Sequence, residues 1–189
     1  GWAVNNIGHC HPAVVEAIIG QAKTLCQTSN AYYTIPQLQL AQLLVDNSCL
    51  DRVFFCNSGA EANEGAVKLA RKYGKLNRGG AYEVITTWNS FHGRTLAMTA
   101  ATGKNHDDDP FQPLPSGFTT VDYDSIDAIR AATTDRTAAV MVEPMAGSTG
   151  VLIPPIGYLE RLREICTKHG ILLIFDEVIT GFGRLGASF

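Results

Sequence analysis

Short apolar runs alternate with helical patterns through most of this chain. The runs lie at residues 82–86, 138–142 and 171–175, and apolar residues at helical spacing fill the segment 158–168. Apolar runs of this length are typical of strands buried on both faces of a sheet. Strands that alternate with helices are typical of a parallel sheet covered by helices. The sequence therefore predicts an α/β fold with a mostly parallel sheet and flanking helices.

Three more segments with helical patterns precede these runs. Pro12 and Pro36 each open one of them, and proline suits the first turn of a helix. The third, at 60–73, has the most regular apolar stripe. A short apolar run at 52–56 comes directly before it and predicts one additional buried strand.

Composition narrows the class of protein. The 189 residues carry a net charge of −3, and the 15 basic residues are scattered, which argues against a nucleic-acid partner. The chain has no apolar stretch near the roughly 20 residues that span a membrane. The five widely spaced cysteines include no CxxC pair and favour a reducing, cytoplasmic setting. His9 and His11 have no third ligand nearby, so we expect no metal site and a small-molecule partner.

Polar or small residues follow the predicted strands, and the first of them are Ser58, Gly59 and Ala60. In parallel sheets, ligands gather beyond the carboxyl ends of the strands. A strand, a turn of small residues and a helix N-terminus together suit an anion, and Ser58 could add a hydroxyl donor for a phosphate. Alternatively, Ser58 only caps the helix.

The motif from Phe91 to Arg94 follows the run at 82–86, and Glu143 ends the run at 138–142. Phe91 could lie flat against a planar ring, and Arg94 could bind a carboxylate through two hydrogen bonds. A surface turn with Arg94 in a salt bridge is the alternative. Glu143 ends a buried strand and needs a partner, which could be Arg94 or an unrelated arginine.

Asp176 and Glu177 follow the apolar run at 171–175. A magnesium site of the Walker B type would look similar, but the chain lacks the GxxxxGK[ST] loop that accompanies it. Gly181, Gly183 and Gly186 fit the dinucleotide pattern GxGxxG. The two carboxylates would repel a pyrophosphate in that turn, so this match is weak.

Five motifs in this order resemble those of the class III pyridoxal-phosphate-dependent aminotransferases. They read GHCHP, NSGAEAN, FHGRT, EP and FDEVITGFGR, and they begin at Gly8, Asn57, Phe91, Glu143 and Phe175. Up to about residue 143 the chain is similar to acetylornithine and ornithine aminotransferases. Its part at 145–187 is similar to ω-amino acid:pyruvate aminotransferases, as in an intermediate member or a chimeric chain. The resemblance implies the large domain of fold type I, a homodimer and pyridoxal 5′-phosphate as cofactor.

The resemblance also implies a cofactor site. Its cofactor-binding residues would be Ser58, Gly59, Ala60, Phe91, His92, Asp176, Glu177, Val178 and Ile179. Residues 58–60 would bind the phosphate, and Phe91 and Val178 would lie on the two faces of the ring. Asp176 would be the catalytic residue, because it keeps the ring nitrogen protonated and the ring electron-withdrawing. Ornithine-type members have a glutamine where this chain has Ile179, so that contact differs here.

The implied reaction moves an amino group from an amino acid or ω-amine to a 2-oxo acid. Arg94 would bind a substrate carboxylate, and Glu143 would pair with Arg94 or release it according to which substrate is bound. An aminomutase or racemase of the same fold, or a cofactor-binding module without catalysis, are alternatives. The lysine that binds the cofactor covalently lies beyond the last motif in this family. We therefore expect an inactive fragment, with an N-terminal segment at 1–50 and an incomplete cofactor-binding domain at 51–189.

Overall fold

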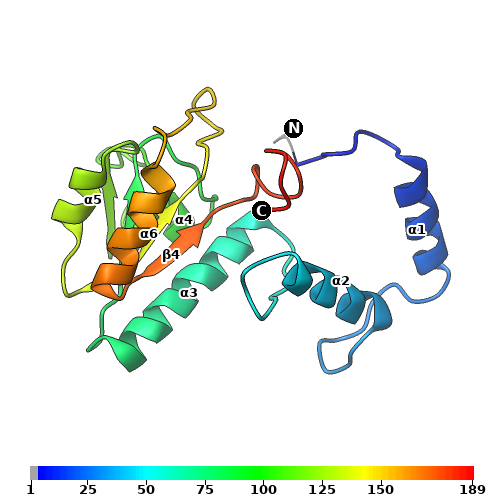
Figure 1. The fold of residues 1–189 in the computed structure, drawn as a ribbon. Coiled ribbons are helices and arrows are strands. Elements are labelled where there is room, and N and C mark those ends of the chain that lie inside the picture. Colours follow the sequence, from blue (N-terminus) through cyan, green and yellow to red (C-terminus); the bar gives the residue numbers. More distant parts are fainter. Residues whose placement is uncertain (1–3) are drawn as a thin grey trace. The chain divides into compact units, whose positions relative to one another are not determined.

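The structure is a computed structural model, and it describes residues 4–189. Contacts between residues divide the chain into two units (Figure 1). One comprises residues 4–54 together with 181–189, and the other comprises residues 55–180. The predicted division into segments 1–50 and 51–189 stays a prediction.

A four-stranded sheet forms the centre of the unit at 55–180, and neighbouring strands in it are parallel. In the order β2-β1-β3-β4 the sheet contains β2 (Phe118–Val121), β1 (Glu83–Thr87), β3 (Thr137–Val142) and β4 (Leu172–Phe175). The predicted parallel sheet is confirmed, and three of the predicted runs match β1, β3 and β4 within one residue at each end. Strand β2 was not predicted, because the two threonines in its sequence FTTV leave no continuous apolar run.

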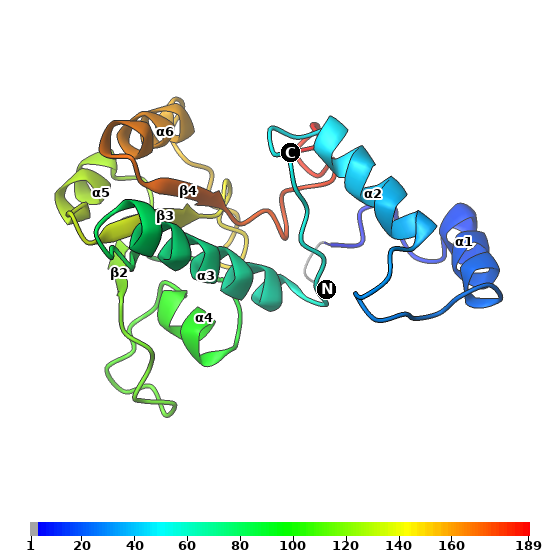
Figure 2. The ribbon, with the colours of Figure 1, turned by 90° about the horizontal axis from the view of Figure 1, so that it is seen from below.

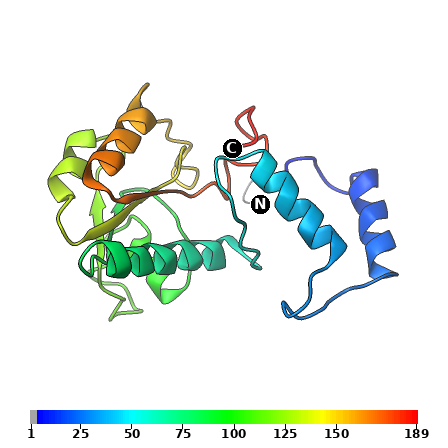
Figure 3. The same cartoon turned by 60° about the horizontal axis from the view of Figure 1, so that its bottom comes forward.

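Helices cover both faces of this sheet (Figures 2 and 3). Helices α3 (Gly59–Asn77) and α4 (Leu96–Ala101) lie on one face, and α5 (Ile126–Ala132) and α6 (Tyr158–His169) lie on the other. Successive residues of a strand point to opposite faces. Val84 therefore packs with the α3 side and Ile85 with the α6 side. All six residues of β3 are buried, which explains its uninterrupted apolar run.

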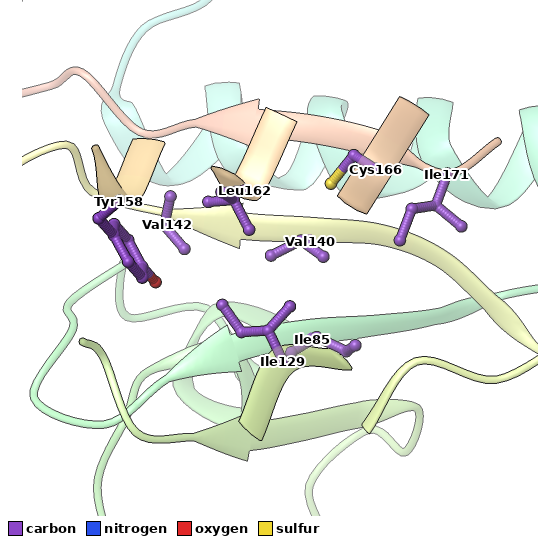
Figure 4. Packing of buried hydrophobic residues seen from close by; sticks show 8 residues of the cluster. All are labelled: Ile85, Ile129, Val140, Val142, Tyr158, Leu162, Cys166 and Ile171. Atoms are coloured by element: carbon purple, nitrogen blue, oxygen red, sulfur yellow. The ribbon is translucent and has the colours of Figure 1, made fainter. Parts of the chain in front are cut away.

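Helix α6 contributes one apolar stripe to the core. Tyr158, Leu162 and Cys166 recur every four residues and are fully buried. They lie along β3 beside Val140 and Val142 (Figure 4). Burial of such side chains is the main favourable contribution to folding. This cluster holds β3 and the turn that follows it in a fixed place.

The strand predicted at 52–56 is wrong. The structure has no strand there, and Phe54 and Phe55 remain 71% and 38% exposed. A strand needs a neighbour that accepts and donates its backbone hydrogen bonds. Among the described residues, no segment pairs with 52–56. An apolar run alone is therefore insufficient to form a strand.

The unit that contains residues 4–54 and 181–189 has two helices, α1 (Pro12–Ala22) and α2 (Ile35–Asp46). Each begins with a proline in its first turn, as predicted, and neither has a buried residue. Asn6 connects the two ends of the chain, because its side-chain amide donates to Phe182 O over 2.9 Å. None of the helices within residues 4–189 has the length and apolar character needed to span a membrane.

Gly74 allows α3 to lie close to the segment that leads into β1. A Cβ atom at Gly74 would lie 1.9 Å from Ala81 O and 3.3 Å from Ala138 Cβ. Helix propensity alone favours alanine over glycine by about 0.5–1 kcal/mol at such a position. Packing therefore opposes propensity at this residue.

Gly74→Ala should lower the free energy of unfolding by about 2 kcal/mol, because the backbone near Ala81 must shift to admit the methyl group. Chemical denaturation measures this change. Gly20→Ala in α1 is the matched control, since a Cβ there meets nothing within 4 Å. Equal or higher stability of Gly74→Ala would contradict the close approach of α3 to this segment.

Candidate active site

The strand order creates a switch point between β1 and β3. The chain passes from β1 to β2 on one side and then returns across β1 to reach β3. Ligands of parallel sheets bind beyond the carboxyl ends of the strands at such a point. His92 follows β1, Glu143 follows β3 directly, and Asp176 follows β4 directly. The structure thus brings together predicted site residues from three strand ends.

The carboxylate of Asp176 is buried and surrounded by hydrogen-bond donors. Its Oδ2 accepts a hydrogen bond from Asn63 Nδ2 over 2.7 Å and lies 2.8 Å from His92 Nδ1. Its Oδ1 accepts from the Val178 backbone N–H over 3.2 Å. The Asp176 N–H donates to Val142 O over 2.9 Å, which fixes the backbone beside β3. These bonds compensate for burying a charged group.

His92 is 1% exposed and is held through both its backbone and its ring. Its N–H donates to Thr102 Oγ1 over 3.1 Å, and its carbonyl accepts from Asn63 Nδ2 over 2.9 Å. We assign the ring hydrogen to Nδ1, because Nδ1 faces the Asp176 carboxylate. The buried Nε2 has no partner among the described residues.

Asn63 is a site residue that the sequence analysis missed. It is 5% exposed and lies on the buried stripe of α3, with Val67, Ala70 and Gly74. Asparagine is a poor helix former, and its side chain competes with the backbone for hydrogen bonds. A lone amide on an apolar stripe was therefore the signal that could have identified it.

Helix α3 begins at Gly59, one residue before the predicted start at residue 60, and Ser58 is its N-cap. Ser58 Oγ accepts from the Glu61 N–H over 3.2 Å, and Glu61 Oε2 accepts from the Asn57 N–H over 2.6 Å. The capping role that the sequence left open for Ser58 is thus present. In the described part of the chain, the Gly59 and Ala60 N–H groups have no acceptor. They can bind an anion, which the helix dipole also favours.

Close contacts join this helix N-terminus to two other predicted segments. A Cβ at Gly59 would lie 2.6 Å from Val178 Cγ2, and a Cβ at Gly93 would lie 2.8 Å from Ala60 Cβ. Residues 58–60, the turn after Phe91 and Val178 therefore lie together. Their individual contacts with a cofactor stay predictions.

Glu177 and Ile179 lie in the turn after Asp176. Thr180 Oγ1 donates to Glu177 Oε2 over 3.3 Å, and burial raises the pKa of Glu177 above its ordinary value. Ile179 lies against Gly147, where a Cβ would approach its Cδ1 to 2.7 Å. Both side chains have partners within the protein, and their roles toward a cofactor stay predictions.

Glu143 and Arg94 do not pair with each other in the structure. Glu143 is 4% exposed, and its two oxygens accept from the Phe91 N–H over 3.1 Å and the Gly147 N–H over 3.4 Å. Arg94 is exposed, and its guanidinium lies 5.7 Å from the centre of the Phe91 ring. Within residues 4–189 no ion pair joins the two. Backbone N–H groups satisfy Glu143 here, and its pairing with Arg94 or release of it according to the substrate stays a prediction.

The surroundings of Glu143 raise its pKa above the ordinary value. Burial is the largest cause, and the nearby charge of Asp176 acts in the same direction. The N–H groups of Phe91 and Gly147, together with His92, oppose this rise. Glu143 therefore binds a proton more readily in the folded protein than in the unfolded chain.

Comparison with known proteins shows the family of this chain. Residues 1–189 match the family model of the class III aminotransferases. The chain belongs to this family. It is 56% identical over its whole length to an acetylornithine aminotransferase of Methanocaldococcus jannaschii and 54% identical to that of Methanothermobacter thermautotrophicus, covering 48% and 47% of them. It spans about half the length of the curated relatives it matches.

A solved ornithine aminotransferase from Toxoplasma gondii, described with partial occupancy of PLP at its active site, has the same fold. Its TM-score is 0.93 at 35% identity, and the match covers all of this chain and 46% of that one. The resemblance to class III aminotransferases, and with it the α/β fold of that class, is confirmed. The residues around Asp176 therefore belong to a fold that this chain shares with the T. gondii protein.

The raised pKa of Glu143 predicts a pH-dependent contribution to stability. Below the pKa of glutamate in the unfolded chain this contribution is complete, and it is lost as the pH rises through the higher pKa of the folded state. The unfolding free energy of the wild type should therefore fall with rising pH above about 4.3, the ordinary pKa of glutamate, relative to that of Glu143→Gln.

Denaturation curves across this pH range test the expectation. Glu160→Gln, the same exchange at an exposed position in α6, is the control and should run parallel to the wild type. A difference between Glu143→Gln and wild type that does not change with pH would contradict the account of Glu143.

Proposed function

We propose that this chain forms a large part of a pyridoxal-phosphate-dependent aminotransferase, which moves an amino group from an amino acid or ω-amine to a 2-oxo acid. The observation that carries the proposal is the buried Asp176 carboxylate, whose Oδ2 contacts Asn63 Nδ2 and His92 Nδ1. The names of the relatives favour N-acetylornithine as the amino donor.

The residues present suit this cofactor. The Gly59 and Ala60 N–H groups at the start of α3 would bind its phosphate, and the Ser58 hydroxyl, which accepts from Glu61, can still donate. Phe91 and Val178 would hold the ring between them. Among residues 4–189, the Val178 N–H alone donates to Asp176 Oδ1, so this oxygen retains the capacity to bind a protonated ring nitrogen.

Bound pyridoxal phosphate supplies an electron-withdrawing ring that stabilises the charge left when the substrate loses its proton. Asp176 would keep a proton on the ring nitrogen through a charge-assisted hydrogen bond. His92 and Asn63 hold the Asp176 carboxylate in the position that this hydrogen bond requires. The exposed guanidinium of Arg94 would bind a substrate carboxylate, and Glu143 holds the backbone of Phe91 beside it.

The cofactor's covalent partner lies outside residues 1–189 in this proposal. The exposed lysines include Lys23, Lys68, Lys72, Lys75 and Lys168, and Lys104 pairs with Asp109 over 3.1 Å. None of them is a partner of Asp176. Residues 1–189 alone would then bind pyridoxal phosphate without a covalent bond and would have no transaminase activity.

A second copy of the chain would cover the apolar side chains of α1 and α2. Ile18, Ile19, Leu38 and Leu43 are each about half exposed or more, at 63%, 49%, 50% and 59%. Exposed apolar residues in this number favour association. We infer a homodimer.

The five cysteines, all free, fit the reducing, cytoplasmic setting that the sequence predicts.

Titration of pyridoxal phosphate into residues 1–189, followed by absorbance, tests the proposal. The wild type should saturate, and Asp176→Ala should weaken binding at least about tenfold, because a hydrogen bond to a charged group is lost. Borohydride added to the complex should leave no cofactor on the protein.

Asp108→Ala, which removes an exposed carboxylate from the loop after α4, is the matched control and should bind like the wild type. Equal binding by Asp176→Ala and the wild type would overturn the role of Asp176. A borohydride-fixed adduct at one particular lysine would overturn the claim that the covalent partner lies outside these residues.

A further inference from the structure

A single amide group joins two segments of the site. Asn63 Nδ2 donates to His92 O over 2.9 Å and to Asp176 Oδ2 over 2.7 Å. An amide NH₂ group has two hydrogens, so these bonds use its full donor capacity. The side chain is 5% exposed, so water does not compete for these acceptors. Asn63 thereby fixes the turn after β1 and the residue after β4 at the same time.

The two oxygens of Asp176 differ as a result. Oδ2 receives Asn63 Nδ2 and His92 Nδ1, whereas Oδ1 receives the Val178 N–H at the longer distance of 3.2 Å. Rotation of the carboxylate out of this orientation would break the bonds to both Asn63 and His92. The arrangement therefore holds Oδ1 in one orientation, with capacity for one more donor.

Helix α3 connects this oxygen to the anion-binding turn. Asn63 lies five positions after Ser58, which is the N-cap of the continuous helix Gly59–Asn77. A helix rises about 1.5 Å per residue and is stiff over this length. Asn63 thus sets the position of Asp176 relative to residues 58–60 through one rigid element.

The side chain of Asn63 is uncharged, and this affects the charge that Asp176 can offer to a ligand. A lysine or arginine at the same place would pair with Asp176 and cancel its charge. An amide donates a hydrogen bond and leaves the negative charge available to a cationic donor. Asparagine therefore orients the carboxylate without competing for it.

We propose that Asn63 is a positioning residue that orients Asp176 toward the ring nitrogen of pyridoxal phosphate, an inference that rests on the proposed function. Asn63 acts through Asp176 and does not touch the cofactor in this account. Loss of Asn63 must then weaken only that part of cofactor binding which depends on the ring nitrogen.

The test compares the binding of two ligands to the protein of residues 1–189. The ligands are pyridoxal phosphate and its analogue in which a C–H group replaces the ring nitrogen. Binding of each is measured by absorbance titration. The wild type should prefer pyridoxal phosphate. Asn63→Ala should raise the Kd for pyridoxal phosphate by about tenfold and leave that for the analogue unchanged within about twofold, because only the first ligand uses Asp176.

Three further variants complete the design. Asn63→Leu keeps the side-chain volume, removes both donors and carries the test if the alanine variant does not fold. Asp176→Ala should remove the same preference and so calibrates the effect. Asn77→Ala removes an amide at the exposed end of the same helix, where it donates to Tyr73 O, and should keep the wild-type preference.

Each other outcome overturns the inference. Equal losses for both ligands in the Asn63 variants would show a purely structural role. An unchanged preference in the Asn63 variants, with the preference lost in Asp176→Ala, would overturn the role of Asn63 and leave the proposed function standing. Equal binding of both ligands by the wild type, unaffected by Asp176→Ala, would overturn the proposed function and this inference with it.

Discussion

The site depends on one buried carboxylate and the groups that hold it. Burying a charge is costly unless hydrogen bonds replace the lost water. Asp176 has such bonds from Asn63, His92 and the Val178 N–H. These donors are an amide, a ring nitrogen and a backbone group, and none is an arginine or lysine. The negative charge of Asp176 therefore remains available to a ligand, which makes the arrangement suited to a cationic ring nitrogen.

The fold supplies this arrangement through the carboxyl ends of its parallel strands. The sheet order β2-β1-β3-β4 places the ends of β1 and β3 side by side at the switch point, with β4 next to β3. Helix α3 then adds a helix N-terminus and Asn63 from one face of the sheet. The buried stripe of α6 holds β3 from the other face. Rigid elements thus position each group, as an active site that orients charges in advance requires.

Several features could be predicted from the sequence because local pattern determines them. Strand β3 contains an uninterrupted apolar run, helix α3 has clear apolar periodicity, and Asp176 directly follows an apolar run. Partners distant in sequence were harder to predict. The run at 52–56 is apolar but has no neighbouring strand, and Glu143 is satisfied by backbone N–H groups that a sequence cannot reveal. Asn63 was missed because its two acceptors lie 29 and 113 positions away.

A crystal structure with bound pyridoxal phosphate tests the central claim most directly. The account predicts that the ring nitrogen lies about 2.7–3.2 Å from Asp176 Oδ1, as a hydrogen bond requires. Asp176 Oδ2 should keep its contacts with Asn63 and His92, and the phosphate should lie at residues 58–60. A ring nitrogen that faces another group, or that binds Oδ2 after Asn63 has moved away, would contradict the account.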